Sequence, residues 1–188
     1  IWSMTKPIVS LAAMQLIESK KLNLNDPINY YLPEFSNLKV LNNLNSKITD
    51  VVDLIEQPTI KNLLLHTAGF SYNFLSDPIG FEYDKINLFG SLSSTLEDEI
   101  KLLSKLPLLF QPSTRWCYSV STDVLGRILE VISGKPLQQI LNEQIFIPLE
   151  MHKTGFKVSD TNTRLLMNSY EFDQLKNKLT NHILEPQR

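Results

Sequence analysis

The chain has 188 residues, of which 43% are hydrophobic and 20% are charged, and its formal net charge is -2 at pH 7. A chain of this length can form a core without disulfides. Its near-neutral charge excludes a basic nucleic-acid-binding surface. The lack of any run of about 20 apolar residues excludes a membrane span within these residues. The single cysteine, Cys117, excludes an intrachain disulfide, and in the absence of a cluster of histidines and cysteines we expect no metal and no cofactor.

The first predicted element is a helix over residues 8–17, directly after the segment Ser-Met-Thr-Lys-Pro at 3–7. Its apolar residues cover most of a helical circumference, which predicts a buried helix. Pro7 is tolerated only near a helix start, where backbone N–H groups have no intrahelical partner, so we place Ser3 at the helix cap or in the first turn.

Residues 36–57 are rich in Asn, Lys and Asp and have no sustained period. This composition predicts an irregular surface segment that contains at most a short strand or helix. A short helix is predicted next, from its cap Thr59 to His66, with Gly69 ending it.

Residues 71–93 mix aromatic residues with Gly, Pro, Asp and Ser, which predicts a long ordered loop. Ser94 and Glu97 then have the spacing of a capping box and open a helix that runs to about residue 105. Residues 107–119 are expected to be irregular.

A helix over residues 122–132 follows, with Ser121 as its cap and Gly134 beyond its end. Its apolar stripe consists of Val124, Leu125, Ile128, Leu129 and Ile132. Residues 137–145 form a last amphipathic stripe. Past Gly155 the pattern weakens, and we expect one strand and a polar helix at about 171–183. Alternating strand patterns are scarce throughout, so the chain is predicted to be mostly helical.

Three side chains are candidates for chemistry. Ser3 and Lys6 share a helix face one turn apart, and a lysine can activate a serine nucleophile if its environment lowers its pKa toward neutrality. The alternative is a helix cap followed by a solvated lysine. Tyr118 stands just before a predicted helix, where a phenol can enter a cleft and relay protons. The alternative is a core tyrosine with a satisfied hydroxyl.

The order and spacing of these residues and of the segments around them resembles the serine β-lactamase-like hydrolases, which include class C β-lactamases, D-alanyl-D-alanine carboxypeptidases and related esterases. The resemblance extends from residue 3 to residue 156. The matching segments are Ser-Met-Thr-Lys-Pro at 3–7, Tyr-Leu-Pro-Glu-Phe at 31–35, Thr-Ile-Lys-Asn-Leu-Leu-Leu-His-Thr-Ala-Gly-Phe at 59–70, Pro-Ser-Thr-Arg-Trp-Cys-Tyr-Ser at 112–119, Asp-Val-Leu-Gly-Arg-Ile-Leu-Glu-Val-Ile-Ser-Gly at 123–134 and Ile-Phe-Ile-Pro-Leu-Glu-Met at 145–151.

The resemblance implies an α+β, β-lactamase/transpeptidase-like fold of which this chain is mostly the helical part. It implies that Ser3 is the acylated nucleophile, that Lys6 assists its deprotonation and that Tyr118 carries protons to the leaving group and later to water. The backbone N–H of Ser3 would supply half of the oxyanion hole. The segment 66–69, His-Thr-Ala-Gly, is implied to be a structural turn that packs and anchors a loop.

Some positions depart from the family pattern. Val120 stands where penicillin-recognising members carry the Asn that binds the substrate's acylamido group, which favours the esterase branch. Ser113 replaces the glycine usual in a Pro-Gly-Thr turn. Residues 153–155, Lys-Thr-Gly, have the letters of the family's third motif, but the residues around them resemble a structural segment, so we do not assign the motif there. We therefore expect residues 1–188 to be a single partial domain without the upstream sheet strands and the third-motif strand.

The expected function is that of a serine hydrolase that forms an acyl-enzyme on a small-molecule substrate, with a carboxylic ester favoured. The alternatives are a β-lactamase, a D-alanyl-D-alanine carboxypeptidase with a peptide substrate, and a non-catalytic remnant that binds peptidoglycan-like peptides or a protein partner. Because losing one oxyanion-hole donor costs about 10²–10³ in rate, we expect weak or no turnover by these residues alone. The sequence predicts neither compartment nor oligomeric state.

Overall fold

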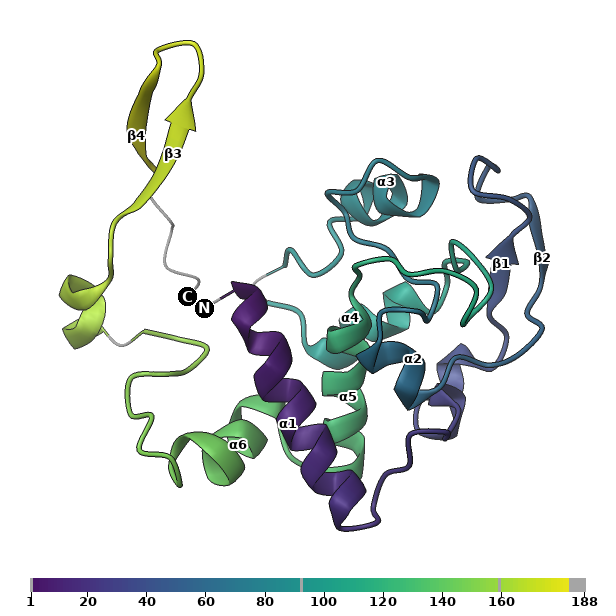
Figure 1. Cartoon of the computed structure of the whole chain (residues 1–188), viewed down its shortest axis with the longest axis horizontal. Coiled ribbons are helices and arrows are strands. Elements are labelled where there is room, and N and C mark those ends of the chain that lie inside the picture. Colours follow the sequence, from purple (N-terminus) through teal and green to yellow (C-terminus); the bar gives the residue numbers. More distant parts are fainter. Residues whose placement is uncertain (1, 92, 159, 183–188) are drawn as a thin grey trace. The chain divides into compact units, whose positions relative to one another are not determined.

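The chain forms two compact units, Ile1–Met151 and His152–Arg188 (Figure 1). The structure is a computed structural model that describes residues 2–91, 93–158 and 160–182. In the part of the chain so described, no helix combines the length and the apolar character needed to cross a membrane.

The larger unit is mainly helical, with one small sheet. Its α-helices are α1 (Thr5–Glu18), α2 (Ile60–Leu64), α3 (Pro78–Lys85), α4 (Leu96–Leu103), α5 (Ser121–Ser133) and α6 (Leu137–Leu141). Shorter turns are η1 (Trp2–Met4), η2 (Ile28–Tyr30), η3 (Pro33–Phe35) and the π-helical η4 (Asn142–Phe146). Strands β1 (Lys39–Leu41) and β2 (Val51–Asp53) pair antiparallel, with Val40 opposite Val52.

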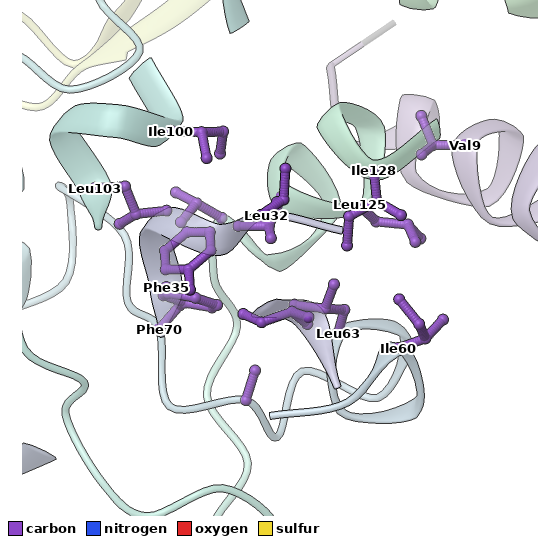
Figure 2. Packing of buried hydrophobic residues seen from close by; sticks show 14 of the residues in the cluster. Val9, Leu32, Phe35, Ile60, Leu63, Phe70, Ile100, Leu103, Leu125 and Ile128 are labelled. Carbon is purple, nitrogen blue, oxygen red and sulfur yellow. The ribbon is translucent and has the colours of Figure 1, made fainter. Parts of the chain in front are cut away.

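Helix α5 organises the core of the larger unit. It contacts α1, α2, α4 and α6. Figure 2 shows Leu125 and Ile128 of α5 beside Leu63 of α2, and all three side chains are buried. Burying a Leu or Ile side chain contributes about 1.5–3 kcal/mol, so this packing helps to stabilise the unit. The apolar stripe predicted for this helix is confirmed, and Gly134 ends it in the left-handed conformation, with φ +65°.

Helix α1 is buried on one side only. Ala12, Ala13 and Leu16 are buried, whereas Leu11 and Met14 are exposed. The prediction of a helix at this position is confirmed, and the predicted burial is found on one face only. A single layer of helices, here α5 and α6, can cover only one face of it.

Residues 71–93 are not the long loop that we expected, because they contain α3. The side chain of Asp77 caps this helix by accepting hydrogen bonds from the N–H groups of Ile79 and Gly80, and Pro78 occupies the first turn. Asp-Pro is typical of a turn but is also a helix start, since Asp is a good cap and Pro is pre-organised for the first position.

Two helix starts differ from the predicted ones by a residue. The cap of α4 is Thr95, paired with Asp98, rather than Ser94 with Glu97. Helix α5 begins at Ser121 itself, and no side chain caps it. In both cases several polar residues stand in a row, so spacing alone does not select the cap.

The smaller unit contains η5 (Asp160–Leu165) and an antiparallel hairpin of β3 (Ser169–Asp173) and β4 (Lys178–His182). The polar helix predicted at about 171–183 is therefore wrong over the residues described, and residue 183 lies outside them. Residues 169–173 alternate between polar and aromatic side chains, which is the period of a strand. The carboxylate of Asp173 accepts the N–H of Lys176 and so helps to close the turn.

Candidate active site

Ser3 lies at the beginning of a long helix. It belongs to η1, the turn that leads into α1, and stands one residue before the N-cap, Met4. No side chain caps α1, so the hydroxyl of Ser3 is not used for that purpose. The N-terminal end of a helix carries a partial positive charge that stabilises nearby negative charge.

Tyr118 joins Ser3 and Lys6. Its hydroxyl donates a hydrogen bond to Ser3 Oγ with an oxygen–oxygen distance of 2.5 Å, although the two residues are 115 positions apart in the sequence. Lys6 Nζ lies 4.7 Å from the centre of the Tyr118 ring. The structure describes no hydrogen bond between Ser3 and Lys6. The three side chains singled out from the sequence are thus together, with the phenol between the hydroxyl and the amine.

The charge of Lys6 favours the phenolate of Tyr118. Burial raises the pKa of Tyr118, but the hydrogen bond that its phenolate form can accept from the Ser3 hydroxyl and the charge of the Lys6 ammonium outweigh burial, so this pKa is lower than that of an ordinary tyrosine. Burial lowers the pKa of Lys6, but its hydrogen bond with Tyr72 and its electrostatic interaction with Tyr118 outweigh burial, so the pKa of Lys6 is raised. This direction is opposite to the lowered amine pKa that a proton-abstracting lysine needs, and it favours the ammonium form of Lys6.

Backbone hydrogen bonds hold the loop that carries Tyr118. The carbonyl of His66 accepts the N–H of Cys117 at 2.9 Å, and the carbonyl of Ser71 accepts the N–H of Val120 at 3.1 Å. These two bonds flank Tyr118 and attach its loop to residues 66–71. The anchoring role expected for this segment is confirmed.

His66 supports Tyr118 from the side. Its Nδ1 accepts the backbone N–H of Ser119 at 3.2 Å, and its ring centre lies 5.0 Å from that of Tyr118. Burial and the charge of Lys6 both lower the pKa of His66, so the imidazole is neutral at pH 7. It orients the loop, in agreement with the packing role expected from the sequence.

Ser113 occupies the turn position where the family pattern has glycine. Its φ is +68°, in the left-handed region that glycine adopts most easily. The Oγ of Ser113 accepts a 2.8 Å hydrogen bond from the side chain of Asn62, which also forms the capping box of α2 with Thr59. The serine therefore keeps the turn and ties it to α2.

Two residues near the site, Tyr72 and Asp123, were not predicted from the sequence to belong to it. Tyr72 accepts a 2.9 Å hydrogen bond from Lys6 Nζ, and burial and Asp123 raise its pKa against the effect of Lys6. Burial raises the pKa of Asp123 to about 6, against the opposing charge of Lys6. Tyr72 lies two residues beyond the matching segment that ends at residue 70, and Asp123 is the first residue of the matching segment 123–134, so their positions beside and within these segments were the available signal.

Residues 153–155 do not lie on a strand, which agrees with leaving the third motif unassigned there. They belong to the smaller unit. Within the described residues, no group of three or more His, Cys, Asp or Glu side chains is arranged to hold a metal ion.

Comparison with known proteins identifies the family. The Beta-lactamase family model matches residues 1–180 of the chain. The chain belongs to the Beta-lactamase family. This membership confirms the resemblance inferred from the sequence segments.

Members of the family that are similar to this chain include Protein Rv1367c from Mycobacterium tuberculosis, 35% identical over 187 residues that cover 99% of this chain and 45% of that protein. Esterase EstB from Burkholderia gladioli is 32% identical over 157 residues, which cover 82% of this chain and 37% of EstB. Among solved structures, EstCE1, a hydrolase with promiscuous acyltransferase activity, has a TM-score of 0.78 at 33% identity, over 96% of this chain and 44% of EstCE1. The predicted β-lactamase-like fold is confirmed, and this Beta-lactamase-family chain spans less than half the length of these relatives.

Proposed function

We propose that this chain supplies the nucleophile and the proton-handling groups of a serine acyl hydrolase that acts on carboxylic esters. The observation that carries the proposal is the 2.5 Å hydrogen bond between Tyr118 and Ser3 Oγ at the start of α1, with the Lys6 ammonium over the phenol ring. The esterase and hydrolase names of its relatives agree with this chemistry.

In the proposed mechanism, the Tyr118 phenolate takes the proton of Ser3 as Oγ attacks the acyl carbon of the ester. The bond from the acyl carbon to the alcohol oxygen then breaks, and Tyr118 returns the proton to that oxygen, leaving an acyl-enzyme. A water molecule attacks the acyl carbon and gives its proton to Tyr118, which passes it to the departing Ser3 oxygen. Lys6 keeps its charge throughout and stabilises the phenolate. An alcohol in place of water would give acyl transfer.

Val120 favours esters over β-lactams. Its side chain is buried in the core, at the residue that precedes α5. An apolar side chain in the core offers no amide to the acylamido group of a penicillin. Hydrolysis of β-lactams or of D-alanyl-D-alanine peptides remains the alternative activity, to be measured beside ester hydrolysis.

Covalent labelling tests the proposal without requiring full turnover. We expect an alkyl fluorophosphonate to form an adduct on Ser3, located by mass spectrometry of the digested protein. Ser3→Ala should abolish the adduct, and Tyr118→Phe should slow labelling by about 10²–10⁴-fold because the proton acceptor is lost. Ser10→Ala is the matched control, since Ser10 lies on the same helix beyond the site, and it should label at the unaltered rate.

Folding must be verified in the same samples by circular dichroism. If the folded protein forms no adduct on Ser3, or if Ser3→Ala labels as fast as the unmodified chain, the enzymatic proposal is wrong. A non-catalytic binding module would then be the better interpretation of the chain.

A further inference from the structure

A continuous row of aromatic rings passes beside the nucleophile. We name it the aromatic strip, and it consists, in order, of Trp116, His66, Tyr118, Tyr72 and Phe74. Successive ring centres lie 6.4, 5.0, 5.4 and 4.8 Å apart. Its middle member, Tyr118, is the one that bonds to Ser3.

The two ends of the aromatic strip face solvent. The side chains of Phe74 and Trp116 are both 66% exposed, although the middle rings are partly buried. Phe74 stacks on Tyr72 with an interplanar angle of 20°, and Trp116 meets His66 edge-on at 69°. Each end thus continues a surface that begins at the catalytic phenol, which distinguishes it from an isolated exposed aromatic residue.

The proton path determines which part of an ester lies near the strip. If Tyr118 returns a proton to the leaving oxygen, that oxygen must come within hydrogen-bonding distance of the phenol. The carbon group attached to this oxygen belongs to the alcohol half of the ester. It must therefore lie along the aromatic strip on one side of Tyr118 or the other, towards Phe74 or towards Trp116, whereas the acyl half is attached to Ser3.

We propose that Phe74 and Trp116 bind the alcohol half of the substrate and that the preferred substrates are esters of aromatic alcohols. The inference rests on the ester chemistry proposed for Ser3. Flat rings fit such a surface because aromatic pairs are favourable at ring-centre distances of about 4.5–7 Å, the range found within the strip itself.

Benzyl acetate and methyl acetate can be compared to test this inference. Their alcohols have similar acidity, so a difference in rate reports binding of the ring rather than the quality of the leaving group. We expect a higher kcat/KM for benzyl acetate. Phe74→Ala and Trp116→Ala should each reduce the benzyl-to-methyl ratio of kcat/KM by about three- to tenfold. Phe81→Ala is the matched control, because Phe81 is a similarly exposed aromatic residue of α3 outside the strip, and it should leave the ratio unchanged.

A binding measurement separates failure of this inference from failure of the proposed function. Saturation-transfer NMR of benzyl alcohol with the Ser3→Ala protein needs no chemistry, and the signal should fall in variants that also carry Phe74→Ala or Trp116→Ala. Binding that is unaffected by both substitutions overturns the inference, even if ester hydrolysis is found. Ring-dependent binding in a protein that forms no fluorophosphonate adduct on Ser3 supports the aromatic strip and contradicts the esterase proposal instead.

Discussion

At the scale of single residues, Asp123 is partly buried and is the charged group whose desolvation has the clearest consequence. Burial raises its pKa to about 6 in the folded protein, against about 4 for an ordinary aspartate. The folded state therefore holds the proton more tightly than the unfolded chain. Protonated Asp123 favours folding, and this contribution is fully present below pH 4 and is lost as the pH rises through 6.

Asp123→Asn removes the cost of burying that charge. Relative to the unmodified chain, the variant should gain up to about 3 kcal/mol in free energy of unfolding at pH 8 and almost nothing at pH 4. Urea unfolding at both pH values measures the difference. The control is Asp53→Asn, because Asp53 is exposed and its hydrogen bond with Lys39 lowers its pKa, so any effect should be small and of opposite sign. A gain from Asp123→Asn that does not depend on pH would contradict this account.

The same substitution reports on the phenol of Tyr118, to which we assign proton transfer. Burial and Asp123 raise the pKa of Tyr118, and Ser3 and Lys6 lower it. Without the Asp123 charge, the acidic limb of Ser3 labelling by a fluorophosphonate should move to lower pH, because the phenolate forms more readily. This shift is distinct from the change in stability, since labelling is measured on folded protein.

At the scale of elements, the turn after α2 connects the core to the Tyr118 loop. Gly69 has φ +94°, and its carbonyl accepts the N–H of Leu109 at 2.7 Å. A Cβ added there would lie 2.4 Å from the carbonyl oxygen of Phe110. The turn therefore requires glycine both for its backbone conformation and for the close approach of the two segments.

Gly69→Ala should lower the free energy of unfolding by about 3 kcal/mol or more, because left-handed strain and a backbone clash add. It should also slow Ser3 labelling in the protein that remains folded, since the loop of Tyr118 shifts. Gly134→Ala is the matched control: its φ is +65°, but nothing lies within 4 Å of the added Cβ, so it should cost only about 1 kcal/mol. Equal losses for the two variants, measured by urea unfolding, would show that the clash is not decisive.

At the scale of the whole molecule, the two units differ in burial. The larger unit has a continuous apolar core, whereas none of the side chains that the structure describes in the smaller unit is buried. Local opening costs little where few apolar contacts are lost. The smaller unit should therefore be the more sensitive of the two to proteolysis.

Brief digestion with trypsin should cut first after Lys153 or Lys157 and leave a persistent fragment that contains the larger unit. Arg127 provides the internal comparison, because it pairs with Glu97 at 2.6 Å and with Glu130 at 3.1 Å within the larger unit. Mass spectrometry of early time points identifies the cuts. Early cleavage after Arg127 would contradict the expected order of stability.

Local patterns in the sequence predicted much of the larger unit. The stripe of α5, the cap Thr59 and the helix-ending Gly134 depend on neighbours within one or two turns, so they can be recognised without knowledge of the fold. The pairing of Ser3 with Lys6 is local in the same way. Their link to Tyr118 came from a resemblance of spaced segments, and the structure brings the three side chains together.

By itself, then, the sequence determined the family, the main helices and the three candidate catalytic side chains. Only the tertiary structure decided that Lys6 bonds to Tyr72, that Asp123 is partly buried and interacts with Lys6, and that five rings form a row past Ser3. It also decided which face of α1 is covered. The reason is that pKa values, burial and ring contacts depend on side chains that lie 50 to 115 residues apart in the sequence. A local sequence pattern encodes neither the desolvation of these side chains nor the distances between them.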